Sequence, residues 1–247
     1  MTVRILRPNW PAPANIHAIS TLRSGGVSGG VYQSLNLGDH VGDAPDRVLE
    51  NRRRLRSEHG LPAEPHWLRQ VHGIEVADLD RLVDATAAPT ADAACTRRGR
   101  VVCAVLTADC LPVLFADVDG ESVAAAHAGW RGLARGVLEA TVTALNRDPS
   151  RLMAWLGPAI GAQRFEVGAE VRAQFLAADR RAGSAFVPGA ADRYLADLAL
   201  LARYRLEALG ITRIFASGEC THSQQDSFFS YRRDGQCGRH ATLIWRG

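Results

Sequence analysis

The alternation of hydrophobic and polar positions along the chain predicts a series of short strands. Residues 16–22 alternate as a half-buried strand does. Residues 101–106 and 153–156 are continuous apolar runs, which are typical of strands buried on both faces. Pro112 is expected to interrupt strand structure, which resumes in the apolar segment at 113–116. Further strands are predicted at 67–71, 75–79, 122–126, 211–216, 228–233 and 241–245.

Amphipathic segments between these strands predict four helices. The first covers 45–58, with Asp43 as its cap and Gly60 as its stop signal. A second follows the turn at 128–132 and runs to about Leu145. The remaining two lie near 168–178 and 192–208.

The connections indicate how these elements are arranged. Asp119–Gly120 is a typical hairpin turn, and 67–71 and 75–79 are close enough in sequence to form a hairpin. The stretch 81–100 has little pattern and is expected to be a loop. The chain has neither an internal repeat nor a linker. Its alternation of strands and helices predicts a single mixed α/β domain over residues 1–247, with a central mixed sheet flanked by helices.

Composition narrows the function. All 29 basic residues are arginine, which excludes mechanisms that need a lysine, such as the Walker A phosphate loop or a Schiff base. The net charge of +3 is too small to indicate a nucleic-acid partner. No apolar run reaches the roughly 18 residues that a membrane span requires. The five cysteines lack CxxC spacing, and no signal peptide is evident at the N-terminus, so we expect reduced thiols in a cytoplasmic protein.

Three reactive side chains, His72, Cys110 and His127, lie just past the ends of predicted strands. Side chains at strand ends are held rigidly and face the crevices where ligands bind. Their wide spacing excludes a zinc finger, whose ligands come in close pairs. Two imidazoles and one thiolate suit Zn²⁺ and leave a fourth position for water, whose pKa the metal lowers towards about 7.

Other readings of the same residues remain open. Cys110 is a candidate nucleophile with His127 as its base and with Asp109 or a backbone amide completing an acyl-transfer site, in which case no metal is needed. A single cysteine or histidine at a strand end is also commonly a packing residue. Asp109 suits an acid, a base, a partner of a histidine or a turn residue, and Asp92 is interpreted as a turn residue.

Arginines are the candidate anion-binding groups. Arg131 lies at a predicted helix N-terminus beside His127, where an anion is favoured and a guanidinium can grip phosphate with two hydrogen bonds. No geometry supports the further candidates Arg52, Arg232 and Arg233. The aromatic side chains of Trp130, Phe228 and Phe229 suit stacking on a planar base, although core packing is their commoner use.

These segments together carry a family resemblance that extends over about residues 17–245. The matching motifs are 70–73 (Gln-Val-His-Gly), 107–114 (Thr-Ala-Asp-Cys-Leu-Pro-Val-Leu) and 127–132 (His-Ala-Gly-Trp-Arg-Gly). Supporting segments are 34–36, 51–52, 155–160, 165–167 and 229–235. The chain resembles the family variously called laccase-like polyphenol oxidoreductase, peptidoglycan editing factor and purine nucleoside phosphorylase. At 91–96 it departs slightly from the usual family pattern, without affecting a ligand position.

The resemblance implies a zinc site formed by His72, Cys110 and His127. It also implies phosphorolysis of adenosine, inosine and methylthioadenosine, deamination of adenosine, and a cytoplasmic monomer or homodimer. We expect Asp109 to be the catalytic acid. The residues expected to bind nucleoside or phosphate are Asn36, Arg52, Gln70, Arg131 and Arg232. Copper is less favoured than zinc, because blue-copper laccases use His-x-His pairs and none of the eight histidines forms one.

Three functional hypotheses follow, besides the disfavoured copper polyphenol oxidase. The leading one is a zinc-dependent purine nucleoside phosphorylase and deaminase. The second is a hydrolase that removes a misincorporated amino acid from a peptidoglycan precursor, a UDP-linked muramyl compound, with zinc-activated water or the Cys110 thiolate as nucleophile. The third is a binding or regulatory protein whose zinc is structural, so that chelation would unfold it.

Overall fold

The computed structural model describes residues 2–82 and 87–247, and its fold is the mixed α/β class that the pattern predicts. Its helices are α1 (Pro45–Glu58), α2 (Trp130–Arg135), α3 (Val137–Leu145), α4 (Ala169–Ala178), α5 (Leu198–Ala208) and α6 (Tyr231–Asp234). Its strands are β1 (Ile5–Leu6), β2 (Ile16–Thr21), β3 (Val76–Asp78), β4 (Ala93–Thr96), β5 (Val102–Thr107), β6 (Leu111–Asp117), β7 (Val123–Ala128), β8 (Leu152–Leu156), β9 (Glu166–Gly168), β10 (Phe186–Pro188), β11 (Arg193–Ala196), β12 (Arg213–Ala216) and β13 (His240–Arg246).

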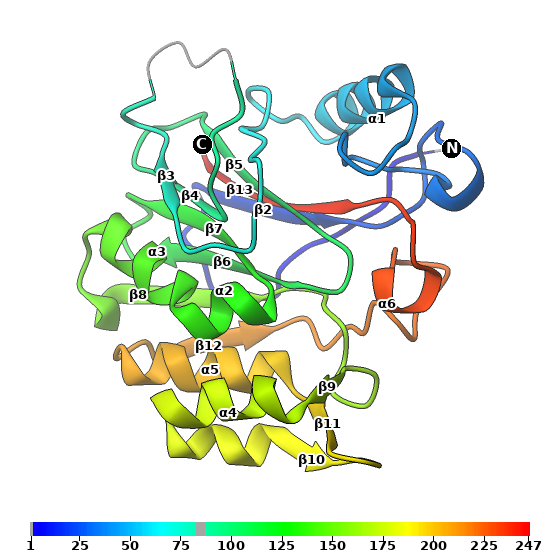
Figure 1. Cartoon of the computed structure of the whole chain (residues 1–247). Coiled ribbons are helices and arrows are strands. Elements are labelled where there is room, and N and C mark those ends of the chain that lie inside the picture. Colours follow the sequence, from blue (N-terminus) through cyan, green and yellow to red (C-terminus); the bar gives the residue numbers. More distant parts are fainter. Residues whose placement is uncertain (1, 83–86) are drawn as a thin grey trace.

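Two of the sheets stack on each other between helical layers (Figure 1). The strand order is β1-β2-β13-β5 in one and β12-β8-β6-β7-β4-β3 in the other, while β10-β11-β9 form a small separate sheet. Apolar residues such as Leu114 and Ile244 fill the space between the two large sheets. Helix α1 covers the outer face of the first sheet through Leu55, and α3, α4 and α5 cover the second. Burial on both faces explains the continuous apolar runs in the sequence.

The β6–β7 hairpin places two of the candidate residues at one edge of the six-stranded sheet. Its turn at Asp119–Gly120 is confirmed, because β6 and β7 pair directly across it. Leu111 lies opposite Ala128 and Pro112 opposite His127, so the start of β6 and the end of β7 coincide. The predicted break at Pro112 is wrong. Proline is tolerated there because it lies next to the strand's first residue, and its carbonyl oxygen still accepts a hydrogen bond from Gly157.

The predicted hairpin of 67–71 and 75–79 does not form. Residues 67–71 make only an isolated bridge, at Arg69, and β3 pairs in parallel with β4. The physical reason lies in Gln70, whose side-chain amide donates to the carbonyl oxygen of Leu106 (2.8 Å) and accepts from its N–H (2.8 Å). A side chain therefore replaces the main-chain pairing that a strand would provide.

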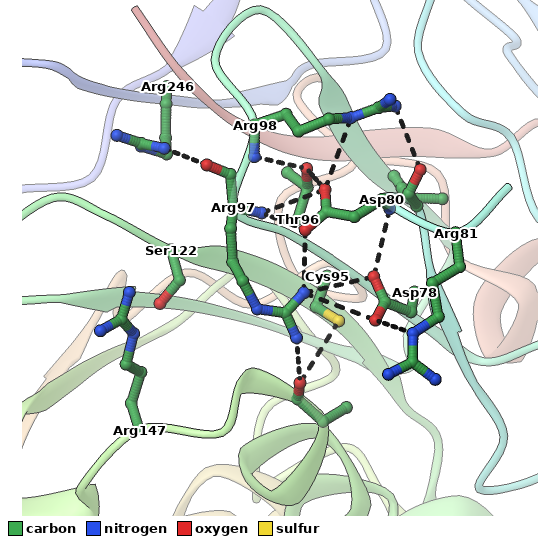
Figure 2. A network of polar contacts seen from close by, with 12 residues as sticks. Asp78, Asp80, Arg81, Cys95, Thr96, Arg97, Arg98, Ser122, Arg147 and Arg246 are labelled. Carbon is green, nitrogen blue, oxygen red and sulfur yellow. Dashed lines mark hydrogen bonds and ion pairs between the residues drawn. The ribbon is translucent and has the colours of Figure 1, made fainter.

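The stretch 81–100, predicted as a loop, contains strand β4; the part at 83–86 lies outside the described residues. The four residues of β4 are small and fully buried, and they lack the β-branched pattern that signals a strand, apart from Thr96. A polar network holds this strand in place (Figure 2). Arg97 donates to Asp78 and Asp80 and, through Nη2, to the carbonyl oxygen of Ala144 in α3 (2.8 Å).

Several helix predictions need correction. The helix expected to run to Leu145 is divided into α2 and α3 at Gly136, whose φ of 103° suits glycine. The segment 192–208 begins with strand β11, and α5 starts only after Asp197 caps it. Residues 228–233, predicted as a strand, instead lead into the short helix α6, which Ser230 caps.

Helix α1 has the predicted bounds but not the predicted cap. Its first flanking residue is Ala44, which offers no capping side chain, and Pro45 begins the helix. The carboxylate of Asp43 instead accepts hydrogen bonds from the Ser28 hydroxyl (2.6 Å) and the Asn36 amide (2.9 Å). Asp43 therefore joins the preceding loop to the helix rather than capping its N–H groups.

Candidate metal centre

The structure brings His72, Cys110 and His127 together. Their ligand atoms all lie within 4.8 Å of one another, and Cys110 Sγ is 3.8 Å from His72 Nε2. The two imidazole rings meet edge to face, with centroids 4.8 Å apart. His72 comes from the loop before β3, Cys110 from the turn between β5 and β6, and His127 from the end of β7.

The backbone around this cluster has a demanding shape. His72 and Asp109 adopt positive φ values of 58° and 88°, a region that non-glycine residues seldom occupy and that often marks functional sites. Gly129 faces the cluster closely: a Cβ there would lie 2.9 Å from His72 Cδ2 and 3.0 Å from Cys110 Sγ. Glycine at this position therefore leaves room for the three side chains to converge.

Asp92 is the group that joins two of the three candidate ligands. Its Oδ1 accepts hydrogen bonds from His127 Nδ1 (2.8 Å) and from the N–H of His72 (2.9 Å). Its Oδ2 accepts from the N–H groups of Val71 (3.1 Å) and Gly73 (2.6 Å). Because Nδ1 of His127 donates to this carboxylate, Nε2 is left to bind a metal. Asp92 is thus a positioning residue rather than the turn residue expected from the sequence.

Charges in the cluster reinforce one another. Burial alone raises the pKa of Cys110, but His127 and His72 lower it to about 6. Burial lowers the pKa of His127, whereas Cys110 and Asp92 raise it to about 9. Burial also opposes ionisation of Asp92, yet its hydrogen bonds hold its pKa below the usual value. The cysteine is therefore held as a thiolate, which is the form that binds metals.

The donor set fits zinc. Zn–N and Zn–S bond lengths place tetrahedral nitrogen and sulfur ligands roughly 3.3–3.6 Å from one another. Cys110 Sγ and His72 Nε2 are 3.8 Å apart and all three ligand atoms lie within 4.8 Å, so a small contraction brings them to zinc-binding distances. Three protein ligands with an open fourth position are typical of catalytic zinc. The same thiolate and imidazole also suit a nucleophile and its base, with Asp92 rather than Asp109 as the third member.

A cavity of about 390 Å³ opens in front of the cluster, a size that accommodates a small organic ligand. Its wall contains no carboxylate among the described residues. The lining residues are His40, Gln70, His72, Leu106, Thr107, Ala108, Cys110, His127, Tyr231 and Arg239. Gln70 is the one predicted substrate-binding residue that this wall includes.

Neither Asp109, which precedes Cys110, nor Arg131, four residues after His127, lines the cavity. The Asp109 carboxylate accepts hydrogen bonds from the Thr221 hydroxyl (2.6 Å) and from the N–H of Arg232 (2.7 Å), so it holds the C-terminal segment. The Arg131 guanidinium lies over the ring of Trp130, 4.4 Å from its centroid.

The remaining predicted binding residues lie elsewhere. Asn36 is buried and donates to Asp43 and to Gly38. Arg52 donates to the carbonyl oxygen of Leu37 and stacks on a tryptophan. Arg232 donates to a main-chain oxygen and lies over a phenylalanine.

Sequence reasoning missed Asp92, Thr107 and Arg239. Thr107 directly follows the strand predicted at 101–106, and Arg239 lies two residues before the strand predicted at 241–245; in the structure they end β5 and precede β13. Thr107 and Arg239 thus both lie beside strand ends, and that position is the sequence signal that identifies them, as it does the three candidate ligands.

A cluster of one cysteine and two histidines beside a strand-end cavity gives this mixed α/β fold a candidate metal site. The family model described as "Multi-copper polyphenol oxidoreductase laccase" matches residues 17–247, and the chain belongs to this family. Its relatives include "Purine nucleoside phosphorylase YfiH" of Escherichia coli, 51% identical over 98% of each chain. Another is "Purine nucleoside phosphorylase PA4543" of Pseudomonas aeruginosa, 52% identical over 97% of each.

Solved structures agree with the fold. The crystal structure of Neisseria meningitidis protein NMB0706 is 49% identical, covers 98% of each chain and has a TM-score of 0.93. The structure of YlmD from Geobacillus stearothermophilus is 33% identical over 98% of this chain and 96% of that one, with a TM-score of 0.88. Among the described residues, no helix has both the length and the apolar character needed to cross a membrane.

Proposed function

We propose that this protein is a zinc-dependent purine nucleoside phosphorylase acting on adenosine, inosine and methylthioadenosine. The observation that carries the proposal is the cavity beside His72, Cys110 and His127, whose described wall contains an arginine but no carboxylate. A cavity wall that carries a positive guanidinium and no negative carboxylate suits an anionic co-substrate. The curated names of relatives about half identical to this chain support the same activity.

Phosphorolysis transfers the sugar from the purine to phosphate. An oxygen of HPO₄²⁻ forms a bond to C1′ while the bond from C1′ to the purine nitrogen breaks. The electron pair of that bond goes to the purine, which takes up the proton of the phosphate, so free base and sugar 1-phosphate are formed. When bound, zinc supplies a Lewis acid that stabilises negative charge and acidifies water. Asp92 holds His127 and the 71–73 segment in the geometry this requires.

We propose deamination of adenosine as a second activity of the same cavity. In that reaction water adds at C6 of the purine and the amino group leaves as ammonia. The open fourth position of a three-ligand zinc site favours it. Asp109 was expected to protonate the leaving group, but its two carboxylate oxygens are engaged with Thr221 and Arg232. The geometry therefore supports phosphorolysis better.

The decisive assay incubates zinc-loaded protein with each nucleoside, with and without phosphate. We expect sugar 1-phosphate and free base only when phosphate is present, and inosine from adenosine without it. Cys110→Ser should abolish both reactions. Cys220→Ser, which changes a partly exposed thiol outside the cavity wall, is the matched control. Absence of all these products from a zinc-loaded sample would overturn the proposal.

The thiolate geometry favours one further candidate, a hydrolase acting on an amide of a peptidoglycan precursor. Cys110, His127 and Asp92 lie in the order of nucleophile, base and orienting carboxylate. Release of an amino acid from a UDP-linked muramyl substrate by metal-free protein would support it. Loss of that release on chelation would count against thiolate attack.

Copper chemistry has weaker support. A multi-copper oxidase needs more than one copper site, whereas the described residues contain a single cluster of three potential ligands. Metal analysis of the purified protein, with an assay of phenol oxidation after copper loading, tests this alternative.

A further inference from the structure

Arg239 is the arginine that lines the cavity beside the candidate metal ligands. It is the one guanidinium among the described lining residues, and the chain has no lysine that could take its place. Tyr231 and His40 are the other polar groups near it on the wall, besides Gln70, Thr107 and the three candidate ligands. The positive charge that an anion can meet on the described wall is therefore that of Arg239, a protonated histidine or a bound metal.

The Arg239 side chain is fixed in place without using all its donors. Its Nη1 donates to the carbonyl oxygens of Cys237 (2.9 Å) and Gly238 (3.1 Å). Its methylene groups pack so close to Gly38 that a Cβ there would lie 2.8 Å from Arg239 Cγ. Nε and Nη2 make no hydrogen bond to any described residue, and no described carboxylate lies within ion-pair distance. A fixed guanidinium with two adjacent free N–H groups is suited to bidentate binding of an oxyanion.

A second polar group on the same wall also lacks a partner. Thr107 is 1% exposed, and its hydroxyl forms no hydrogen bond within the described structure. Leaving a buried hydroxyl unpaired is unfavourable, so a ligand gains affinity if rotation of the Thr107 side chain turns this enclosed hydroxyl towards it. Thr107 is the last residue of β5, and His240, the residue after Arg239, lies directly opposite it on β13. The two strands thus bring Thr107 and Arg239 to the same end of the four-stranded sheet.

We propose that Arg239 binds the phosphate co-substrate in this cavity, with the Thr107 hydroxyl as a second hydrogen-bonding group. The identity of the anion as inorganic phosphate rests on the proposed phosphorylase function. Binding of a tetrahedral oxyanion rests on the cavity itself. The proposal assigns to Arg239 the role that the sequence suggested for Arg131, whose guanidinium lies over Trp130 and outside the cavity wall.

The first experiment measures direct binding of inorganic phosphate to zinc-loaded protein by calorimetry. We expect Arg239→Gln to weaken binding by about 10- to 100-fold, the range for losing a charge-assisted bidentate contact. Arg239→Lys keeps the positive charge but lacks the two adjacent N–H groups of a guanidinium, so we expect an intermediate loss of phosphate affinity. Thr107→Val should weaken binding about 3- to 10-fold. Arg213→Gln removes the same charge from an exposed position on β12 and should leave binding unchanged.

The second experiment measures steady-state phosphorolysis. Arg239→Gln should raise the KM for phosphate by a similar factor, while the KM for the nucleoside stays within about twofold. A general structural defect would instead affect both substrates. Thermal melting of each variant checks folding, and Arg239→Lys provides the test if the glutamine variant is unstable.

The outcomes separate this inference from the proposed function. If phosphate binds to wild type and is weakened by Arg239→Gln, but no nucleoside is cleaved, the anion site stands and the phosphorylase function fails. If nucleoside is cleaved and the KM for phosphate is unchanged in Arg239→Gln and Arg239→Lys, the function stands and this inference is overturned. A rise in the KM for phosphate confined to Arg131→Gln would likewise overturn it, as would wild-type protein that binds no phosphate.

Discussion

Replacement of Asp92 by asparagine probes how a single buried carboxylate supports the candidate metal centre. The side chain is 0% exposed and accepts four hydrogen bonds, two on each oxygen. An amide has nearly the same shape, but one oxygen becomes an NH₂ group that cannot accept. Whichever way the amide is oriented, two of the four donors lose their acceptor and face another donor.

The size of the effect follows from these contacts. Hydrogen bonds to a charged group contribute about 1.5–3 kcal/mol each, so losing two should destabilise the fold by at least about 3 kcal/mol. The metal should be affected separately, because His127 loses its fixed orientation and the loop carrying His72 loses its anchor. Removing such an outer partner of a ligand typically lowers metal affinity by about 10- to 100-fold.

Asp117→Asn provides a matched comparison. Asp117 is also buried (2% exposed), and it accepts hydrogen bonds from the N–H groups of Asp119 and Glu121 and from the Ser122 hydroxyl, at the opposite end of β6. Both variants should lose similar stability in denaturant unfolding of the metal-free proteins. Zinc affinity, measured by competition with a chromophoric chelator, should fall only in Asp92→Asn. Equal zinc affinities for the two variants would refute the positioning role.

Three further predictions concern the metal, the glycine beside it and a buried histidine. Chelation should leave the far-ultraviolet circular dichroism intact and abolish activity, whereas unfolding on chelation would identify the zinc as structural. Gly129→Ala should prevent zinc binding, since its Cβ would press on His72 and Cys110; Gly183→Ala, whose nearest contact is 3.5 Å away, should bind zinc normally. Burial and the charge of Arg239 lower the pKa of His240 to about 3, compared with about 6.5 in an unfolded chain. Protonation of His240 thus favours the unfolded chain. The stability that the neutral, buried imidazole preserves is fully present above about pH 6.5 and is lost as the pH falls towards 3, at up to roughly 1.4 kcal/mol per pH unit. His240→Leu should therefore flatten the acid side of the stability curve, and an unchanged slope would contradict the burial argument.

The candidate ligands were predictable because each depends on local sequence. His72 and Cys110 lie in the loops just past strand or strand-like segments and His127 lies near the end of β7, and short-range patterns detect such segments well. Their neighbours in sequence were poorer guides. Asp109 has the positive φ of the turn at Cys110, which directs its carboxylate towards Thr221 and away from the cavity.

The rest of the site depends on pairings between distant strands. Thr107 and His240 meet through β5 and β13, which are 133 residues apart at that point, and this register cannot be read from local periodicity. Asp92 reaches His127 because β4 pairs with β7, and β4 itself lacked a strand signal, since its small residues suit close packing more than a pattern. Gln70 was predicted as a binding residue and does line the cavity, but its amide is engaged with Leu106.

The attachment of the 71–73 segment to Asp92 also has a consequence for how a metal enters and leaves. The three N–H groups of this segment bond to one side chain instead of to a neighbouring strand. Opening the segment therefore breaks the contacts to a single carboxylate and leaves both large sheets paired, which requires far less free energy than global unfolding. Exchange of the metal with solution would then be limited by the opening rate of one short loop, so its half-life can be short in a protein that unfolds slowly.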